Sequence, residues 1–418
     1  MAEIKKADGI IDWLDQRLAV RTLTKVLMTE YWIPKNINFL WAMGVVLMVL
    51  FMILIVSGIF LLMYYKPDIK LAFDSVNYTI MQEVEYGWLW RHMHGVAASL
   101  VFLVIYIHMF TGIYYGSYKK GREMIWITGM LLFVTFSAEA FSGYMLPWGQ
   151  MSYWAAQVIT NLFGGIPFIG DALVVWIRGD FLVADSTLTR FFMLHVLLLP
   201  LVILLVIALH FYSLRIPHVN NQEAEEFDFD VEAKKYLDGK KKESKVVPFW
   251  PVFLSKDFFV VGVAMTLFFY LVCYHYAFAL DPINFDPANN MKTPAHIYPE
   301  WYFLWSYEVL RGFFFDIGGI AAMDIGLAAF GFANVAFFIL PFLDRNTNHV
   351  APAHKRPAFF IWFWIMLVDM IVLTVYGKLP PTGANAWVGF FAAITFIGLF
   401  IALPIITKIE AKNIGGAK

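Results

Sequence analysis

Two apolar stretches that begin and end in histidine decide the fold: HGVAASLVFLVIYIH at 94–108 and HVLLLPLVILLVIALH at 195–210. A helix needs about 20 apolar residues to cross a bilayer, and ionisable side chains inside such a helix mark functional sites. Each stretch therefore predicts a membrane-spanning helix that carries two histidines within the membrane.

The spacing of the histidines predicts two sites at different depths. His94 and His108 are 14 residues apart and His195 and His210 are 15 apart, which is about 21 and 22 Å along a helix at 1.5 Å per residue. At about 100° per residue, each pair stays near one helix face. If both helices run inward, His94 and His195 share the outer level and His108 and His210 the inner level. Two such pairs indicate two bis-histidine haems, the metal being iron.

Two other uses of these histidines are possible. A lone intramembrane histidine can simply hydrogen-bond to a neighbouring helix, but matched pairs on two helices argue against that reading. Zinc needs four ligands, and we expect no carboxylate or cysteine beside these histidines. The single cysteine, Cys273, also excludes an internal disulfide and a Cys-x-x-Cys-His haem attachment.

The composition is that of a membrane protein. Hydrophobic residues make up 60% of the 418 residues and charged residues 15%, against roughly 25% charged in soluble domains. The net charge of −1 gives no sign of a nucleic-acid partner. We predict an all-α membrane protein with eight transmembrane helices and an N-terminal amphipathic surface helix. The expected spans are roughly 38–65, 88–115, 124–146, 191–214, 257–280, 321–343, 358–377 and 386–407.

Charges between the spans predict the orientation. Most of the 31 Lys and Arg residues fall in the N-terminal segment, the even-numbered connections and the C-terminal tail. The positive-inside rule then places both termini in the cytoplasm. We expect an amphipathic segment at 1–36, a four-helix di-haem domain at 37–217, a solvated cytoplasmic linker at 218–250 and a four-helix C-terminal domain at 251–410.

Glycines and arginines support the haem interpretation. Gly44 and Gly58 on the first span, and Gly129 and Gly143 on the third, repeat the 14-residue histidine spacing. Small residues let a flat macrocycle approach the helix backbone, although they also serve ordinary helix packing. Arg91 and Arg190 precede the outer histidines, where they could pair with haem propionates or act as interfacial anchors.

Several longer motifs resemble the cytochrome b family, the quinol-oxidising core of cytochrome bc and bf complexes. Together with the four histidines and the four glycines, these motifs extend the resemblance over about residues 10–405. The motifs are SGYMLPWGQMSYWAAQVITNLF at 142–163, TLTRFFMLH at 187–195, PFWPVFLSKD at 248–257 and PEWYFLW at 299–305.

The resemblance implies a function for each region. His94 and His195 match the ligands of the low-potential outer haem, and His108 and His210 those of the high-potential inner haem. The quinol-oxidation motif falls on Pro299, Glu300, Trp301 and Tyr302, with Tyr144 and 147–163 as the wall of that pocket. Lys256 and Asp257 match polar residues of the quinone-reduction site, and Trp41 and Asn36 fall where the family packs the inner haem and quinone region. Glu300 would accept a proton from quinol. Tyr302 would bind the quinol ring oxygen or shape the pocket.

The same resemblance implies the setting. We expect a bacterial quinol–cytochrome c reductase subunit in the inner membrane, beside a Rieske iron–sulfur protein and a c-type cytochrome, in a homodimeric complex. Electrons would pass through two b haems to a quinone-reduction site and contribute to the proton gradient.

Four positions depart from the mitochondrial pattern. The second histidine pair is spaced by 15 residues, as in the bf type, and Arg215 stands where the mitochondrial type has a histidine. His218 is an alternative quinone contact. Thr111 replaces an arginine near the inner propionates. No cysteine near the first span matches the extra covalent haem of the bf type.

Two other functions fit parts of the pattern. A haem b anchor of a dehydrogenase or hydrogenase would also react with quinone, but such anchors usually have fewer spans and no PEWY loop. A proton-coupled transporter could use intramembrane histidines without haem, so a reduced-minus-oxidised spectrum separates that class.

Overall fold

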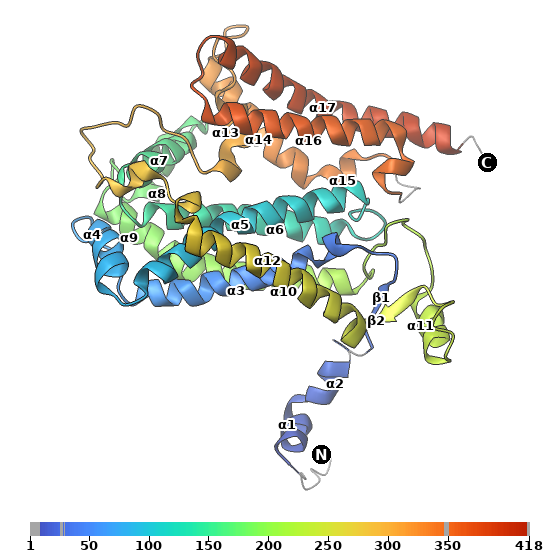
Figure 1. Cartoon of the computed structure of the whole chain (residues 1–418). Helices are drawn as coiled ribbons and strands as arrows, with labels where there is room; N and C mark the ends of the chain where they lie inside the picture. The colour runs from blue at the N-terminus through green and yellow to red at the C-terminus, as the bar shows by residue number, and fades with distance from the viewer. Residues whose placement is uncertain (1–8, 26–27, 29, 347–350, 416–418) are drawn as a thin grey trace.

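The computed structural model describes residues 9–25, 28, 30–346 and 351–415. Long helices lie side by side and make up most of the molecule (Figure 1). Seven are long and apolar enough to cross a membrane, which confirms seven of the predicted spans. The seven candidate spans are Phe39–Leu62, Gly87–Tyr114, Glu123–Met145, Asp185–Arg215, Phe249–Tyr274, Pro357–Lys378 and Ala384–Lys412.

Some of these spans are built from several elements. The first joins a 3-10 turn, η2, to α3, and the fourth joins α9 to α10 through a π-helical turn, η5. The fifth joins another π turn, η6, to α12. The bounds are η2 Phe39–Ala42, α3 Met43–Leu62, α5 Gly87–Tyr114, α6 Glu123–Met145, α9 Asp185–Met193, η5 Leu194–Leu198, α10 Leu199–Arg215, η6 Phe249–Phe253, α12 Leu254–Tyr274, α16 Pro357–Lys378 and α17 Ala384–Gly415.

The span expected at 321–343 is not one continuous helix. It is divided into α14 (Ala322–Phe338) and α15 (Leu340–Leu343), and α14 has 17 residues. Pro341 lies at the start of α15, and a proline has no N–H to continue the hydrogen bonds of the preceding helix. The predicted eighth span is therefore not among the seven long apolar helices, and the count of eight transmembrane helices stays a prediction.

Shorter elements connect the long helices at both ends of the bundle, and two further ones, α1 and α2, precede the first span and extend away from the bundle (Figure 1). They are α1 Ile10–Leu18, α2 Val20–Thr24, β1 Trp32–Pro34, α4 Ala72–Asp74, η3 Ser75–Glu83, α7 Gln150–Leu162, η4 Phe163–Gly165, α8 Gly170–Arg178, α11 Phe229–Leu237, β2 Val246–Pro248, η7 Tyr276–Ala279, η8 Pro282–Phe285, η9 Trp301–Phe303, α13 Leu304–Arg311 and η10 Ala353–Lys355.

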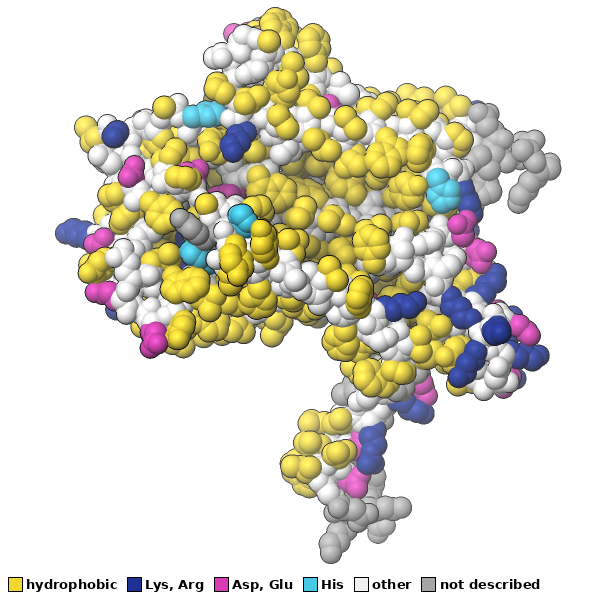
Figure 2. Space-filling view, in the orientation of Figure 1, with side chains coloured by type: hydrophobic (Ala, Val, Ile, Leu, Met, Phe, Trp, Pro, Cys, Tyr) yellow, Lys and Arg dark blue, Asp and Glu magenta, His cyan; other side chains and the backbone are white. Residues whose placement is uncertain are grey.

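Apolar side chains cover the outside of the bundle as well as its core. Hydrophobic residues spread over the middle of the face in Figure 2, while Lys and Arg gather at the end that carries α11. Leu205, Phe259 and Ile401 are each more than half exposed on three different long helices. Helices that are apolar all round suit a lipid environment, where the intrahelical bonds satisfy the backbone.

The 218–247 segment is more ordered than the solvated linker that we expected from its charges. β2 pairs antiparallel with β1, with Trp32 opposite Pro248. Asn221 and Glu232 are buried, and Glu232 accepts a hydrogen bond from the backbone N–H of Lys245 at 2.7 Å. The strand pairing was not visible in the sequence, because it joins segments more than 200 residues apart.

The expected N-terminal amphipathic segment falls on α1, α2 and β1, while residues 1–8 lie outside the described part of the chain. No residue of α1 is buried, and its apolar side chains Ile10, Ile11 and Trp13 are exposed. Its placement on a membrane surface stays a prediction.

A buried cluster of charges ties the loop after α5 to the second half of the chain. Arg356 and Asp344 are fully buried, with Nη1 and Oδ2 2.8 Å apart. Lys119 Nζ lies 2.7 Å from the same Asp344 oxygen, and Arg356 Nε lies 2.8 Å from Glu410. Burial alone would raise the pKa of Asp344, but the charges of Arg356 and Lys119 hold it below its usual value. Tyr118 adds a 2.6 Å hydrogen bond to Asp344.

Two histidine levels and two cavities in the helix bundle

The four predicted histidines meet in two pairs. His94 on α5 and His195 on η5 have ring centroids 6.1 Å apart, and His108 on α5 and His210 on α10 have centroids 6.4 Å apart. The rings of the two pairs are inclined at 78° and 71°. Each pair thus faces across a gap between two helices.

A π-helical turn explains the unequal spacing of the pairs. His195 lies within η5, in which the hydrogen bonds follow a π pattern. A π turn takes up an additional residue in the helix, and such turns are frequent at functional sites. The 15-residue interval on η5 and α10 therefore matches the 14-residue interval on α5, a detail that regular helix geometry did not predict.

The ring separations fit an iron atom held between two imidazoles. A metal–nitrogen bond of about 2.0 Å on each side, with about 1.1 Å from each nitrogen to its ring centre, gives centroids roughly 6 Å apart. The observed 6.1 and 6.4 Å agree with this value. In the described part of the chain, no group of three or more His, Cys, Asp or Glu could hold a metal ion, so the donor set suits bis-histidine iron better than zinc.

Hydroxyl groups fix which nitrogen carries the proton in two of the rings. Ser57 Oγ lies 2.9 Å from His94 Nδ1 and donates its own hydrogen to the Ile53 carbonyl at 2.6 Å. Thr128 Oγ1 lies 3.0 Å from His210 Nδ1 and donates to Met124 at 2.7 Å. Each hydroxyl must therefore accept from Nδ1–H, which leaves Nε2 free to bind a metal.

The four predicted glycines lie against these rings. A Cβ on Gly143 would stand 2.4 Å from Cε1 of His195, and one on Gly129 3.3 Å from Cε1 of His210. At Gly58 and Gly44 the distances to His94 and His108 would be 3.4 and 3.9 Å. Because Gly143 has the least room, it has the strongest requirement for glycine.

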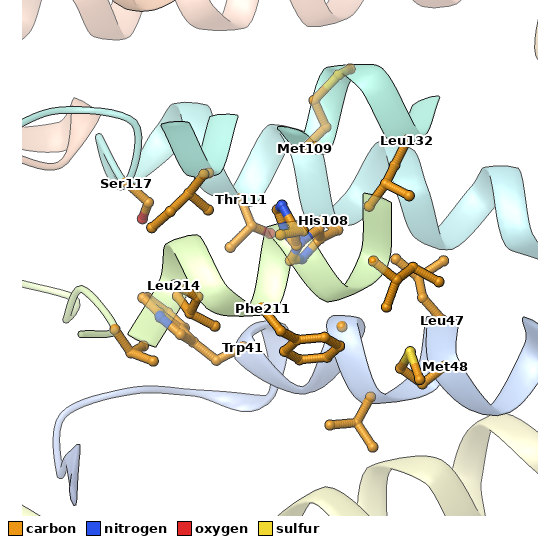
Figure 3. Close-up of a pocket in the computed structure, with 18 of the residues that line it drawn as sticks. Trp41, Leu47, Met48, His108, Met109, Thr111, Ser117, Leu132, Phe211 and Leu214 are labelled. Atoms are coloured by element: carbon orange, nitrogen blue, oxygen red, sulfur yellow. The ribbon is translucent and has the colours of Figure 1, made fainter. Parts of the chain in front are cut away.

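The inner histidine pair opens into an apolar cavity of about 350 Å³. His108 and Thr111 extend from α5 toward the space bordered by Trp41 and Phe211 (Figure 3). Trp41 also donates a 3.1 Å hydrogen bond to the carbonyl of Asn220. Thr111 Oγ1 donates to Ile107 at 2.7 Å, so its hydroxyl hydrogen is used within its own helix.

The predicted quinone-reduction residues divide between this cavity and its surroundings. Arg215, His218 and Asp257 line it. The guanidinium of Arg215 lies 3.8 Å from the Tyr31 ring centre, and His218 stacks between Tyr31 and Phe229.

Asp257 is 1% exposed and its Oδ1 has no hydrogen-bond partner among the described residues. Lys256 lines a neighbouring cavity of about 320 Å³ that shares Asp257. Asn36 instead donates to Asn221 at 3.3 Å, and neither residue lines the larger cavity.

The outer histidine pair opens into a smaller cavity of about 110 Å³. Arg91, Gly143, Tyr144, Glu300 and Tyr302 line it together with His94 and His195. Four separate stretches of sequence therefore converge here, as the sequence predicted for the outer site. Pro147, from the predicted wall at 147–163, also lines it.

Glu300 has the environment of a group that exchanges protons near neutral pH. Burial, and then the charge of Asp281, raise the pKa of Glu300 to about 7, against a hydrogen bond from Tyr144 that lowers it. Two neighbouring side chains of the PEWY motif have defined contacts with α5. The Tyr302 ring stacks on Phe102 with centroids 3.9 Å apart, and Trp301 Nε1 donates to Ser99 at 2.8 Å. Pro299 precedes them in irregular chain.

One predicted residue lies elsewhere. Arg190 is exposed, donates to the carbonyl of Trp176 and lies against Gly179. It is not among the residues that line the outer cavity. The structure thus does not bring this residue to the outer cavity, because the C-terminal end of α8 binds its guanidinium. Of the two arginines, Arg91 lines the cavity.

Several residues at the two levels were not predicted. Asp281 and Asn284 enter the outer cavity from the loop after α12, and Glu139 lies beside His195, although we expected no carboxylate near the histidines. Ser57 and Thr128 each directly precede one of the spaced glycines, Gly58 and Gly129. That hydroxyl–glycine pair was a signal in the sequence that could have identified them.

Comparison with known proteins agrees with this geometry. Residues 28–217 match the family described as cytochrome b/b6/petB, and residues 287–397 match cytochrome b (C-terminal)/b6/petD. Cytochrome b of Rickettsia conorii is 41% identical over 97% of this chain and 96% of its own length. Cytochrome b of Rhodobacter capsulatus is 40% identical over 96% and 92%.

A solved structure also matches nearly the whole chain. It is titled hyperthermophilic respiratory Complex III and superposes with a TM-score of 0.86 at 40% identity, over 96% of this chain and 100% of that one. The two family matches together cover more than half of the chain. The first contains the four histidines, and the second contains the PEWY loop. The chain therefore belongs to the cytochrome b family of cytochrome bc complexes.

Proposed function

We propose that this chain is the membrane electron-transfer subunit of a quinol–cytochrome c reductase. It oxidises quinol at the outer cavity and passes electrons toward a quinone-reduction site at the inner cavity. The observation that carries the proposal is the connection of each histidine pair to its own cavity, with a partly buried carboxylate, Glu300, in the outer one. The relatives named cytochrome b support the same role.

Two haem b groups are the cofactors in this proposal. His94 and His195 hold the outer, low-potential haem, and His108 and His210 hold the inner, high-potential haem. When bound, the haems supply one-electron redox chemistry. The ring separations, the Nδ1 partners and the close glycines support this assignment, and Arg91 is placed to pair with a propionate of the outer haem.

At the outer cavity, the residues of this chain handle protons. Oxidation of a quinol to a quinone releases two protons and two electrons. Glu300 accepts a proton from a quinol hydroxyl, and its pKa of about 7 lets it pass that proton to water. Tyr144 hydrogen-bonds to that carboxylate, while Tyr302, Trp301 and Pro299 close and shape the pocket. One electron leaves to a Rieske iron–sulfur partner.

The second electron crosses inward against the membrane potential. Each charge moved through 100 mV stores about 2.3 kcal/mol, so the transfer adds to the proton gradient. At the inner cavity, Asp257 delivers protons to the quinone being reduced. Arg215 and His218 contact the ring, Lys256 supplies charge from the neighbouring cavity, and Asn36 acts through Asn221.

The same proposal fixes the setting of the chain. We place it in the bacterial inner membrane with both termini in the cytoplasm, α14 as an eighth crossing and α1 on the membrane surface. The di-haem domain is 37–217, the C-terminal domain 251–410, and 218–250 connects them. A Rieske protein, a c-type cytochrome and a second copy of the complex complete the assembly.

Spectra and one substitution test the proposal. The purified complex should show two b-type haems in a reduced-minus-oxidised spectrum. Glu300→Gln should lower quinol:cytochrome c reductase activity about 100-fold or more, because a positioned general base contributes about 10²–10⁴-fold, with both haems retained. The matched control is Glu85→Gln, an exposed glutamate.

The outcomes separate the alternatives. Absence of b-type bands would favour a transporter that uses histidines without haem. Full activity of Glu300→Gln would remove the role given to this carboxylate. Quinone reactivity without cytochrome c reduction in the whole complex would favour a membrane anchor of a dehydrogenase or hydrogenase.

A further inference from the structure

Among the described residues, an acidic side chain lies within ion-pair distance of the outer histidine pair and none of the inner pair. Glu139 lies on α6, one helical turn before Gly143, and its side chain is 18% exposed. Its carboxylate oxygen Oε1 lies 3.0 Å from Nδ1 of His195, and its own backbone carbonyl lies 3.0 Å from the same nitrogen. His195 is therefore contacted twice by one residue.

The geometry determines the direction of these hydrogen bonds. When Nε2 of His195 faces its partner His94 across the gap, Nδ1 must carry the hydrogen and donate it. The carbonyl and the carboxylate of Glu139 are both acceptors, and they share this single hydrogen. At the inner level, the corresponding acceptor on His210 is the neutral hydroxyl of Thr128 at 3.0 Å.

The other contacts of Glu139 do not explain why a carboxylate stands here. Its second oxygen, Oε2, is buried without a hydrogen-bond partner among the described residues. Within that part of the chain, His195 is the only ion-pair partner found for Glu139. Burying a carboxylate inside a membrane bundle is costly, so a purely structural role would be better served by a neutral residue.

We propose that Glu139 is a positioning residue that strengthens His195 as an iron ligand and lowers the reduction potential of the outer haem. A carboxylate that accepts the Nδ1–H of a ligating histidine orients the ring and makes the ligand more basic. A more basic ligand stabilises ferric over ferrous iron. The proposal rests on the haem assignment of the proposed function and adds to it a cause for unequal potentials at the two levels.

Redox titration of the complete complex tests this role. Glu139→Gln keeps the size and the hydrogen-bond acceptor but removes the charge. We expect it to shift the reduction equilibrium of the outer haem about tenfold toward the ferrous form, which is about 59 mV for a one-electron couple. The inner haem of the same molecules is the internal reference and should keep its potential.

Two more variants sharpen the test. Glu139→Ala removes the side chain but keeps the carbonyl acceptor, so it should raise the outer potential while retaining the haem. Glu123→Gln makes the same chemical change at the start of α6 and should alter neither haem. The low-temperature electron paramagnetic resonance signal of the ferric outer haem should change in both Glu139 variants, because it reports on the axial ligands.

Each other outcome overturns the proposal. An unchanged outer potential in Glu139→Gln would show that the carboxylate does not tune the ligand. Equal shifts at both haems, or loss of the outer haem in both Glu139 variants, would show that Glu139 acts on the bundle as a whole. Absence of b-type haem from the unsubstituted complex would instead reject the haem assignment itself, which distinguishes the two failures.

Discussion

At the scale of single residues, the space beside each histidine differs from one glycine to the next. A methyl group at Gly143 would meet the His195 ring at 2.4 Å, where atoms must move, whereas at Gly44 it would meet His108 at an ordinary 3.9 Å. The close approach of helix α6 to the outer ring therefore leaves no room for adjustment, while the inner ring has some.

This difference predicts unequal effects of the same substitution. Gly143→Ala should displace His195 and remove most of the outer-haem signal from the reduced-minus-oxidised spectrum. Gly44→Ala is the matched control and should retain most of the inner-haem signal. Equal losses would mean that contact with the haem plane, rather than with the histidine ring, sets the need for glycine.

Glu300 gives a prediction about pH. Its raised pKa of about 7 means that the folded protein favours the protonated carboxyl. The contribution of this group to the stability of the loop is therefore present at low pH and is lost as the pH rises through about 7. The proton-accepting form has the opposite dependence, so quinol oxidation should rise as the pH increases through about 7 and then level off.

Steady-state reductase rates measured across neutral pH check this dependence. Glu300→Gln should lose the inflection as well as most of the rate, whereas Glu85→Gln should keep both. An inflection that persists in Glu300→Gln would assign it to another group.

At the scale of elements, the long helices were predictable and their irregularities were not. Long apolar runs such as 94–108 decide a span by length alone, because a bilayer demands it. The break before Pro341 has a local cause in the proline itself, but the pairing of β1 with β2 depends on partners distant in sequence. Glu139 was missed for the same reason, since 56 residues separate it from His195.

Some residues of the candidate site were likewise predictable from the sequence, and others were not. The histidines, the glycines and Glu300 follow from spacing and motif, and the structure gathers them at two cavities. Arg190 has its hydrogen-bond partner at the C-terminal end of α8, and no local sequence pattern predicted that contact. The positions of Asp281 and Asn284 depend on how a loop of the second half folds over the first.

The buried charge cluster gives a prediction about stability. Removing one member of a buried ion pair costs about 3–5 kcal/mol, because the partners stay buried and uncompensated. Arg356→Gln removes the ion-pair partner of Glu410 and leaves Asp344 with Lys119 alone, so it should lower the free energy of unfolding by about this amount. Thermal unfolding in detergent measures it. Arg345→Gln, at an exposed position nearby, should change little; similar losses in both variants would contradict a special role for the cluster.

At the scale of the whole molecule, hydrogen bonds and ion pairs connect the two halves of the chain. Tyr106 donates to the carbonyl of Tyr302 at 2.6 Å, and Trp126 Nε1 donates to that of Phe337 at 2.8 Å. The charge cluster and the β1–β2 pair join the halves at the end of the bundle that carries α11 (Figure 1). The exposed turn near Gly239 is the covalent connection between them.

These contacts predict that the covalent connection is dispensable. Two polypeptides, 1–239 and 240–418, produced together should assemble, copurify and retain both b-type haems. A split inside α12, after Gly262, is the control and should fail because it cuts a membrane helix. Failure of the first pair to copurify would show that the halves need the peptide bond to find each other.

The buried cluster around Arg356 has a consequence for descent as well as for stability. A protein whose halves recognise each other through buried charges can be encoded by one gene or by two, since fusion or fission at an exposed turn leaves the recognition surface intact. A gene fusion or fission at the position of Gly239 would therefore leave the assembled membrane bundle unaltered, so selection need not remove it.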